Sequence, residues 1–96
     1  MTAKQYVDGV YKSYYRQGIF ITKDIAKDIA AKQILEGFNN LEEAEEYYEI
    51  FKDREMVFYD VYGVMVTPKM LKWAIDFIKK EWHGDFDYVV KLKFLK

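Results

Sequence analysis

The last twelve residues alternate in polarity, and this alternation constrains the fold more than any other feature of the chain. One side of the alternation is apolar and carries Phe86, Tyr88, Val90, Leu92 and Phe94. The other side carries Asp85, Asp87, Val89, Lys91 and Lys93. Because successive side chains of a β-strand point to opposite faces, the pattern predicts a C-terminal strand over residues 86–95 with one buried face. The pattern indicates part of the fold, but it does not indicate a catalytic or binding function.

Length and composition predict one domain. The 96 residues are 51% hydrophobic and 19% aromatic, which suffices to bury a single core and argues against disorder. No linker divides the sequence, so we expect residues 1–96 to form a single compact domain. The absence of cysteine excludes disulfides and cysteine-ligated metals. Without a signal peptide or a membrane-spanning apolar run, we expect a cytoplasmic, intracellular protein with no membrane partner.

Capping patterns predict two helices in the first forty residues. The first begins after Thr2, which opens a Thr-x-x-Gln capping box, and ends near Gly18 in a left-handed cap. The second begins after Thr22 and extends to about Phe38. Its apolar side chains spread around much of the helical circumference, which predicts a central helix that is contacted from two sides.

Two more helices are predicted further along the chain. Asn40 with Glu43 three residues later is the capping signature of the third. The fourth has the clearest boundaries, because Thr67 can cap it, Pro68 suits its first position and Gly84 can close it.

The segment Met56–Val66 is rich in aromatic and β-branched residues, which favours strand. It fits one long strand kinked at Gly63 or two short strands around it, and an extension of the third helix remains an alternative. The predicted class is therefore α+β: about four helices with a small antiparallel sheet, in the order helix, helix, helix, strand, helix, strand.

Catalytic motifs are missing from the sequence. His83 is the single histidine and Ser13 the single serine, so no Ser-His-Asp or Cys-His arrangement can form. The glycines are isolated and make no phosphate-binding loop. His83, Asp85 and Asp87 are close in sequence, but the aspartates more simply keep the outer strand face polar than bind a metal. We therefore expect no enzymatic activity, no cofactor and no metal.

The third helix carries an acidic arc that is interrupted by Ile50. The arc consists of Glu42, Glu43, Glu45, Glu46, Glu49 and Asp53, and the candidate partner-binding residues in it are Glu42, Glu45, Glu46, Glu49 and Asp53. One interpretation is a solvated face whose first glutamates complement the helix N-terminus. The other is a docking face for a protein partner with a basic surface. On this second interpretation the chain is a small non-catalytic protein that acts by protein–protein contact, such as the accessory or inhibitory proteins that phages and other mobile elements encode.

An alternative function is a small nucleic-acid-binding module that uses a lysine-rich face of the fourth helix. That face carries Lys69, Lys72, Lys79 and Lys80 beside Trp73. Residues 67–96 hold seven Lys and Arg against four Asp and Glu, whereas residues 41–66 hold two against eight. The sequence pI of about 5.8 makes nucleic acid the less favoured partner.

The charge order of the last strand predicts a two-fold homodimer. Antiparallel self-pairing centred on Val89 sets Asp87 opposite Lys91 and Asp85 opposite Lys93. Pairing with residues 56–66 of the same chain is the competing arrangement. Sedimentation at micromolar concentration should show a dimer that Val90→Pro disrupts. A strict monomer, or a dimer indifferent to that substitution, would exclude this interface.

Overall fold

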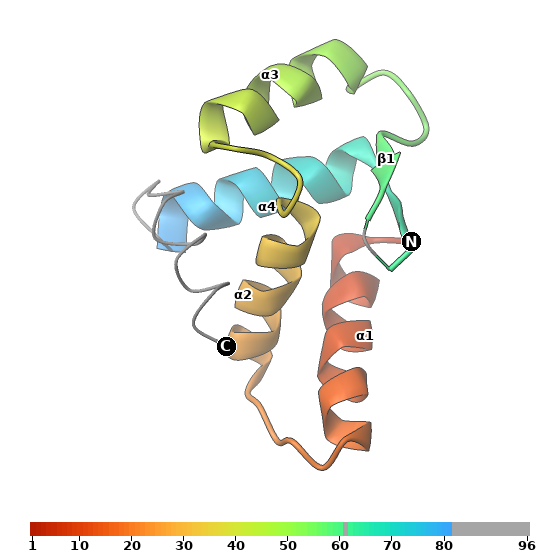
Figure 1. Cartoon of the computed structure of the whole chain (residues 1–96), viewed down its shortest axis with the longest axis vertical. Coiled ribbons are helices and arrows are strands. Elements are labelled where there is room, and N and C mark those ends of the chain that lie inside the picture. The colour runs from red at the N-terminus through yellow and green to blue at the C-terminus, as the bar shows by residue number, and fades with distance from the viewer. Residues whose placement is uncertain (61, 82–96) are drawn as a thin grey trace.

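The computed structural model describes residues 1–60 and 62–81, which form four helices and a two-stranded antiparallel sheet (Figure 1). In chain order these elements are α1 (Ala3–Arg16), α2 (Lys23–Ile34), α3 (Leu41–Phe51), β1 (Phe58–Tyr59), β2 (Met65–Val66) and α4 (Pro68–Glu81). The predicted α+β class with four helices and a small antiparallel sheet is confirmed. The predicted strand over residues 86–95 lies outside the described residues.

All four helices begin at the predicted caps. The side-chain oxygen of each cap accepts a hydrogen bond from the backbone N–H three residues later, at 3.1 Å for Thr2 and Thr22, 2.7 Å for Asn40 and 3.2 Å for Thr67. The capping box of α1 is complete, because the Gln5 side chain accepts from the Thr2 backbone at 2.8 Å. Each such cap contributes on the order of 1 kcal/mol, so local sequence sets where these helices start.

The helix ends agree with the prediction less uniformly. Gly18 has a φ of 78° after the end of α1, as a left-handed cap requires. The predicted end of the second helix at Phe38 is wrong, because α2 stops at Ile34. Phe38 instead packs its ring against Tyr47 and Phe58, with centroid separations of 5.4 and 5.7 Å. Joining this aromatic cluster requires the chain to leave the helical path before Phe38.

The core is organised around α4. This helix packs against α1, α2 and α3, and in Figure 1 it runs between α3 on one side and the α1–α2 pair on the other. Leu71, Ala74 and Ile78 are fully buried, and Ile75 is 2% exposed. The opposing face of α2 is rich in buried alanine, which lets the two backbones approach closely. Burying each large apolar side chain of this kind stabilises the fold by about 1.5–3 kcal/mol.

The segment between α3 and α4 forms a hairpin of two short strands around Gly63, one of the two strand arrangements that its sequence allows. Phe58 pairs with Val66 and Tyr59 with Met65. The turn is closed by Asp60, whose Oδ1 accepts from the backbone N–H groups of residues 62 and 64, each at 2.9 Å. The φ of 77° at Gly63 is accessible to glycine without strain.

The same aspartate attaches the hairpin to α1. The Tyr6 hydroxyl donates to Asp60 Oδ2 at 2.6 Å and lies 3.2 Å from Gln33 Oε1. Tyr6 is 5% exposed, so this hydrogen bond to a carboxylate forms in a partly water-excluded site. Burial of the phenol, followed by its hydrogen bond to Asp60 and then by the Asp60 charge, raises the pKa of Tyr6.

We expect Tyr6→Phe to lower the free energy of unfolding by about 1.5–3 kcal/mol at neutral pH, because a hydrogen bond to a charged acceptor is lost. A raised pKa means that the folded state holds the phenol proton more tightly than the unfolded state. The contribution of the Tyr6 phenol to the free energy of unfolding is therefore complete below the ordinary tyrosine pKa of 10.0, and it declines as the pH rises above that value.

Denaturant unfolding between pH 8 and pH 11 measures this difference. The native chain should lose more stability across that range than Tyr6→Phe does. Tyr15→Phe is the matched control, because Tyr15 is 57% exposed and should behave as the native chain does. Parallel losses for native and Tyr6→Phe chains would contradict the assigned role of the Tyr6 hydroxyl.

Candidate functional site

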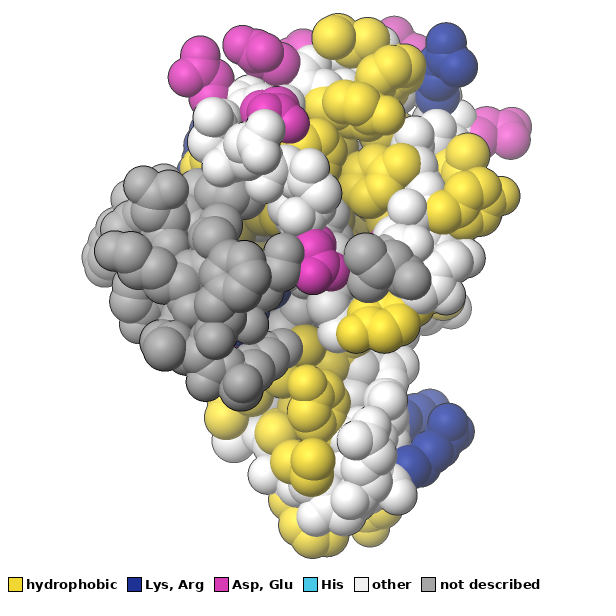
Figure 2. Space-filling model, in the orientation of Figure 1, with side chains coloured by type: hydrophobic (Ala, Val, Ile, Leu, Met, Phe, Trp, Pro, Cys, Tyr) yellow, Lys and Arg dark blue, Asp and Glu magenta, His cyan; other side chains and the backbone are white. Residues whose placement is uncertain are grey.

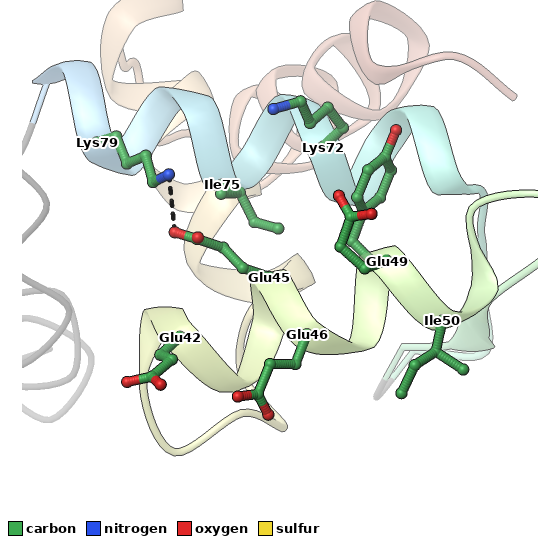
Figure 3. Close-up of a pocket in the computed structure, with 9 residues that line it drawn as sticks. Glu42, Glu45, Glu46, Glu49, Ile50, Lys72, Ile75 and Lys79 are labelled. Carbon is green, nitrogen blue, oxygen red and sulfur yellow. Dashed lines mark ion pairs between the residues drawn. The ribbon is translucent and has the colours of Figure 1, made fainter.

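Four of the glutamates of α3 occupy two rows rather than one surface, and the fifth, Glu43, lies at the N-terminal cap, where its carboxylate accepts a hydrogen bond from Asn39 at 3.1 Å. Residues four apart on a helix lie nearly above one another, so Glu42 aligns with Glu46 and Glu45 with Glu49. Figure 3 shows that Glu45 and Glu49 point toward α4, whereas Glu42 and Glu46 point away from it. We call Glu45 and Glu49 the inner row.

The inner row is engaged with cations of the chain itself. Glu45 Oε1 lies 2.8 Å from Lys79 Nζ on α4, and Glu49 Oε2 lies 2.9 Å from Lys52 Nζ. The hydrogen bond to Glu49 raises the pKa of Lys52. Such half-exposed pairs contribute little stability each. They nevertheless mean that both inner carboxylates already have a positive partner.

The other row faces solvent. Glu42, Glu46 and Asp53 are exposed, and none of them forms an ion pair with another of the described residues. Ile50 continues the line of Glu42 and Glu46 one turn further and is 71% exposed. We call Glu42, Glu46 and Ile50, together with Asp53 in the turn that follows α3, the outer row. It combines exposed carboxylates with one exposed apolar side chain, and Asp53 is partly compensated because its charge, after the hydrogen bond to Glu49, helps to raise the pKa of Lys52.

A cleft of about 590 Å³ lies along the border between α3 and α4 (Figure 3). Ile75 forms an apolar part of its lining, and Tyr48 lies beside Lys72, whose Nζ is 5.9 Å from the ring centroid. Glutamates of both rows and the lysines of α4 complete the lining. Chemically, this border can hold a guanidinium or ammonium group between carboxylates, with an aliphatic stem against Ile75.

The lysine-rich face predicted for the fourth helix is divided by neighbouring carboxylates. Lys72 Nζ lies 3.0 Å from Asp76 Oδ1, and this hydrogen bond raises the pKa of Lys72. Lys79 is paired with Glu45, as described above. Lys69 and Lys80 are exposed. Two of the four lysines, Lys72 and Lys79, therefore already have a carboxylate partner, and these ion pairs would have to break before the lysines could bind a phosphate.

Sequence reasoning did not find the contact among Tyr6, Gln33 and Asp60. It lies at the edge of a second hollow, of about 600 Å³, between α1 and the hairpin. The described lining of this hollow includes Asp60 but no lysine, arginine or histidine. The Asp-x-x-Gly spacing of Asp60 and Gly63 was a usable signal for the turn. Nothing in the local sequence pairs Asp60 with Tyr6.

Several predictions fall on the end of the chain. The proposed dimer interface, made by Asp85, Asp87, Val89, Lys91 and Lys93, lies outside the described residues and stays a prediction, as does any role of His83. Within residues 1–60 and 62–81, no three histidine or carboxylate side chains gather as metal ligands. In the same part of the chain, every helix is too short or too polar to cross a membrane.

No protein-family model matches this chain, and comparison with curated proteins and with solved structures finds no significant similarity.

Proposed function

We propose that this chain is a small non-catalytic interaction protein that binds a partner with a basic surface through the outer row of α3. One observation carries the proposal: Glu42, Glu46 and Asp53 are exposed and have no ion pair among the described residues, and Ile50 lies among them 71% exposed. Negative charge and an apolar side chain therefore share one stripe of the surface.

Two features of this stripe support a partner over a purely solvated face. Glutamates four residues apart on a helix repel each other, and the helix N-terminus compensates Glu42 better than it does Glu46 or Asp53. An isoleucine exposed on the same stripe adds nothing to solubility. Protein interfaces commonly combine an apolar centre with a charged rim, in which the charges accelerate encounter and the apolar contact slows dissociation.

The inner row is less available to a partner than the outer row. Glu45 and Glu49 are held by Lys79 and Lys52, so they would have to release these cations before binding another. We therefore assign Glu42, Glu46 and Asp53 to the partner, Glu45 to the α3–α4 contact through Lys79, and Glu49 to its local pair with Lys52. Such a protein would act inside the cell, as an accessory or inhibitor that occupies a basic surface otherwise used by nucleic acid.

The nucleic-acid alternative has less support. Its lysines would need to face phosphate together, but Lys72 and Lys79 are already paired with Asp76 and Glu45. An exposed acidic row on α3, the helix packed against α4, would repel the same phosphates. Both observations favour a basic protein partner.

The test compares two variants of equal charge. Glu42→Gln/Glu46→Gln neutralises the two glutamates of the outer row and leaves Asp53, and Glu45→Gln/Glu49→Gln neutralises the inner row. Binding of a fluorescent lysine-rich peptide is measured by anisotropy at several salt concentrations. The outer variant should weaken binding by about fivefold or more and flatten its salt dependence, because one to three kcal/mol of interfacial electrostatics is removed. The inner variant should bind nearly as the native chain does.

Melting temperatures of both variants should stay close to the native value, because exposed charges contribute little to stability. Equal losses of binding in both variants would mean that the peptide responds to the net charge of the chain and not to the position of the glutamates, and this would contradict docking at the outer row. Unchanged binding in the outer variant would exclude the outer row as a docking face.

A further inference from the structure

The connection between α1 and α2 exposes a cluster of apolar side chains. We call Tyr15, Ile19, Phe20 and Ile25 the apolar tip; their exposed fractions are 57%, 47%, 77% and 47%. The rings of Tyr15 and Phe20 meet edge to face with centroids 5.2 Å apart, so they support each other at the surface. Soluble domains rarely gather exposed aromatic and branched aliphatic side chains in one place without a contact to make there.

Cations border the apolar tip. Lys12 and Arg16 are exposed on α1 and form no ion pair with any other described residue. Lys23 is bound to Asp8 at 2.6 Å. The most exposed carboxylate at this end is Asp24, whose side chain is 94% exposed and lies 4.0 Å from Lys27. The free charge beside Tyr15 and Phe20 is therefore positive.

The apolar tip and the outer row lie at opposite ends of the molecule. Figure 1 places the α1–α2 connection at one end of the longest axis and α3 at the other, and this axis spans 40 Å. Figure 2 shows acidic side chains over α3, with hydrophobic and basic side chains at the same end, and hydrophobic side chains at the other end with basic ones beside α1. One surface is apolar and basic, and the other is acidic with an apolar centre.

We infer that the apolar tip of one copy of this chain docks on the outer row of α3 in a second copy. This inference rests on the proposed function, because it names a second copy as a basic partner of that row. Phe20 and Ile19 would bury apolar surface against Ile50. Arg16 and Lys12 would meet Glu46 and Glu42, which the described chain leaves without a cation.

The arrangement is head to tail. Because the two surfaces are different and lie at opposite ends, a pair of copies keeps one apolar tip and one outer row unused. Further copies can add until a ring closes or the concentration limits growth. This behaviour differs from that of a two-fold strand dimer, in which both copies present the same surface and association stops at two.

Two variants, each weakened at one surface, test the inference in the full chain. Ile19→Ser/Phe20→Ser removes the two apolar side chains of the tip that would meet Ile50 and leaves the outer row intact. Glu42→Gln/Glu46→Gln removes the two charges of the outer row that would meet Arg16 and Lys12 and leaves the tip intact. Tyr59→Ser is the matched control, because Tyr59 is a 62% exposed aromatic residue outside both surfaces. Circular dichroism first confirms that each variant is folded.

Sedimentation velocity over a concentration series then reports association. The native chain and Tyr59→Ser should both grow in mean mass with concentration. Each of the two double-substitution variants alone should associate more weakly than the native chain, by about tenfold or more. A loss of this size corresponds to the removal of one apolar anchor or of the facing charges. An equimolar mixture of the two variants should form one-to-one pairs, because one intact tip then meets one intact outer row.

Other results would overturn head-to-tail docking. A native chain that stays monomeric, a dimer that survives in both variants, or a mixture that associates no better than its parts would each do so. The lysine-rich peptide assay separates this failure from failure of the proposed function. If the peptide still requires Glu42 and Glu46 while the native chain stays monomeric, the outer row binds basic partners and the second copy is excluded as one of them.

Discussion

The fold depends on the burial of one face of α4. Leu71, Ala74, Ile75 and Ile78 lie on this face, and the alanine-rich side of α2 packs close to it. α3 packs on α4 as well. Ala44 of α3 is fully buried, and the next residue, Glu45, reaches Lys79 on α4. The rotation of α3 in this contact determines which glutamates face α4 and which remain exposed.

Much of this architecture could be predicted from local sequence. The four caps at Thr2, Thr22, Asn40 and Thr67 depend on side chains that bond to the backbone three residues away, so a single sequence contains the whole interaction. The end of α2 could not be predicted in this way. Phe38 lies beyond the end of α2 and contacts aromatic partners on α3 and β1, which are distant in sequence.

The residues of the candidate site could be predicted from the sequence, but their arrangement in space could not. The acidic arc of α3 can be found by counting charges, but its division into two rows requires the position of Lys79 on another helix. Likewise, the spacing of Asp60 and Gly63 indicates a turn, whereas the hydrogen bond from Tyr6 spans most of the chain. Long-range contacts of this kind depend on packing, which helical periodicity alone does not specify.

Among the described residues, α3 and α1 expose opposite charges. One ion pair, Lys79 with Glu45, joins α3 to α4, and Lys52–Glu49 and Lys72–Asp76 are local pairs of single segments. Among the described residues, exposed carboxylates without an ion pair remain on the outer row, and exposed cations without one remain beside the apolar tip. An interaction protein needs such uncompensated surfaces, because groups that are already paired must first lose their partners before they can bind another molecule.

Native-state amide hydrogen exchange tests the central position of α4 most directly. If α4 is the surface on which the other helices pack, the amides from Leu71 to Ile78 should exchange through global unfolding alone, together with those near Ile34 in α2. Amides of α3 should exchange sooner, because that helix packs on α4 from one side. Exchange in α4 that is faster than in α3 would contradict this account of the fold.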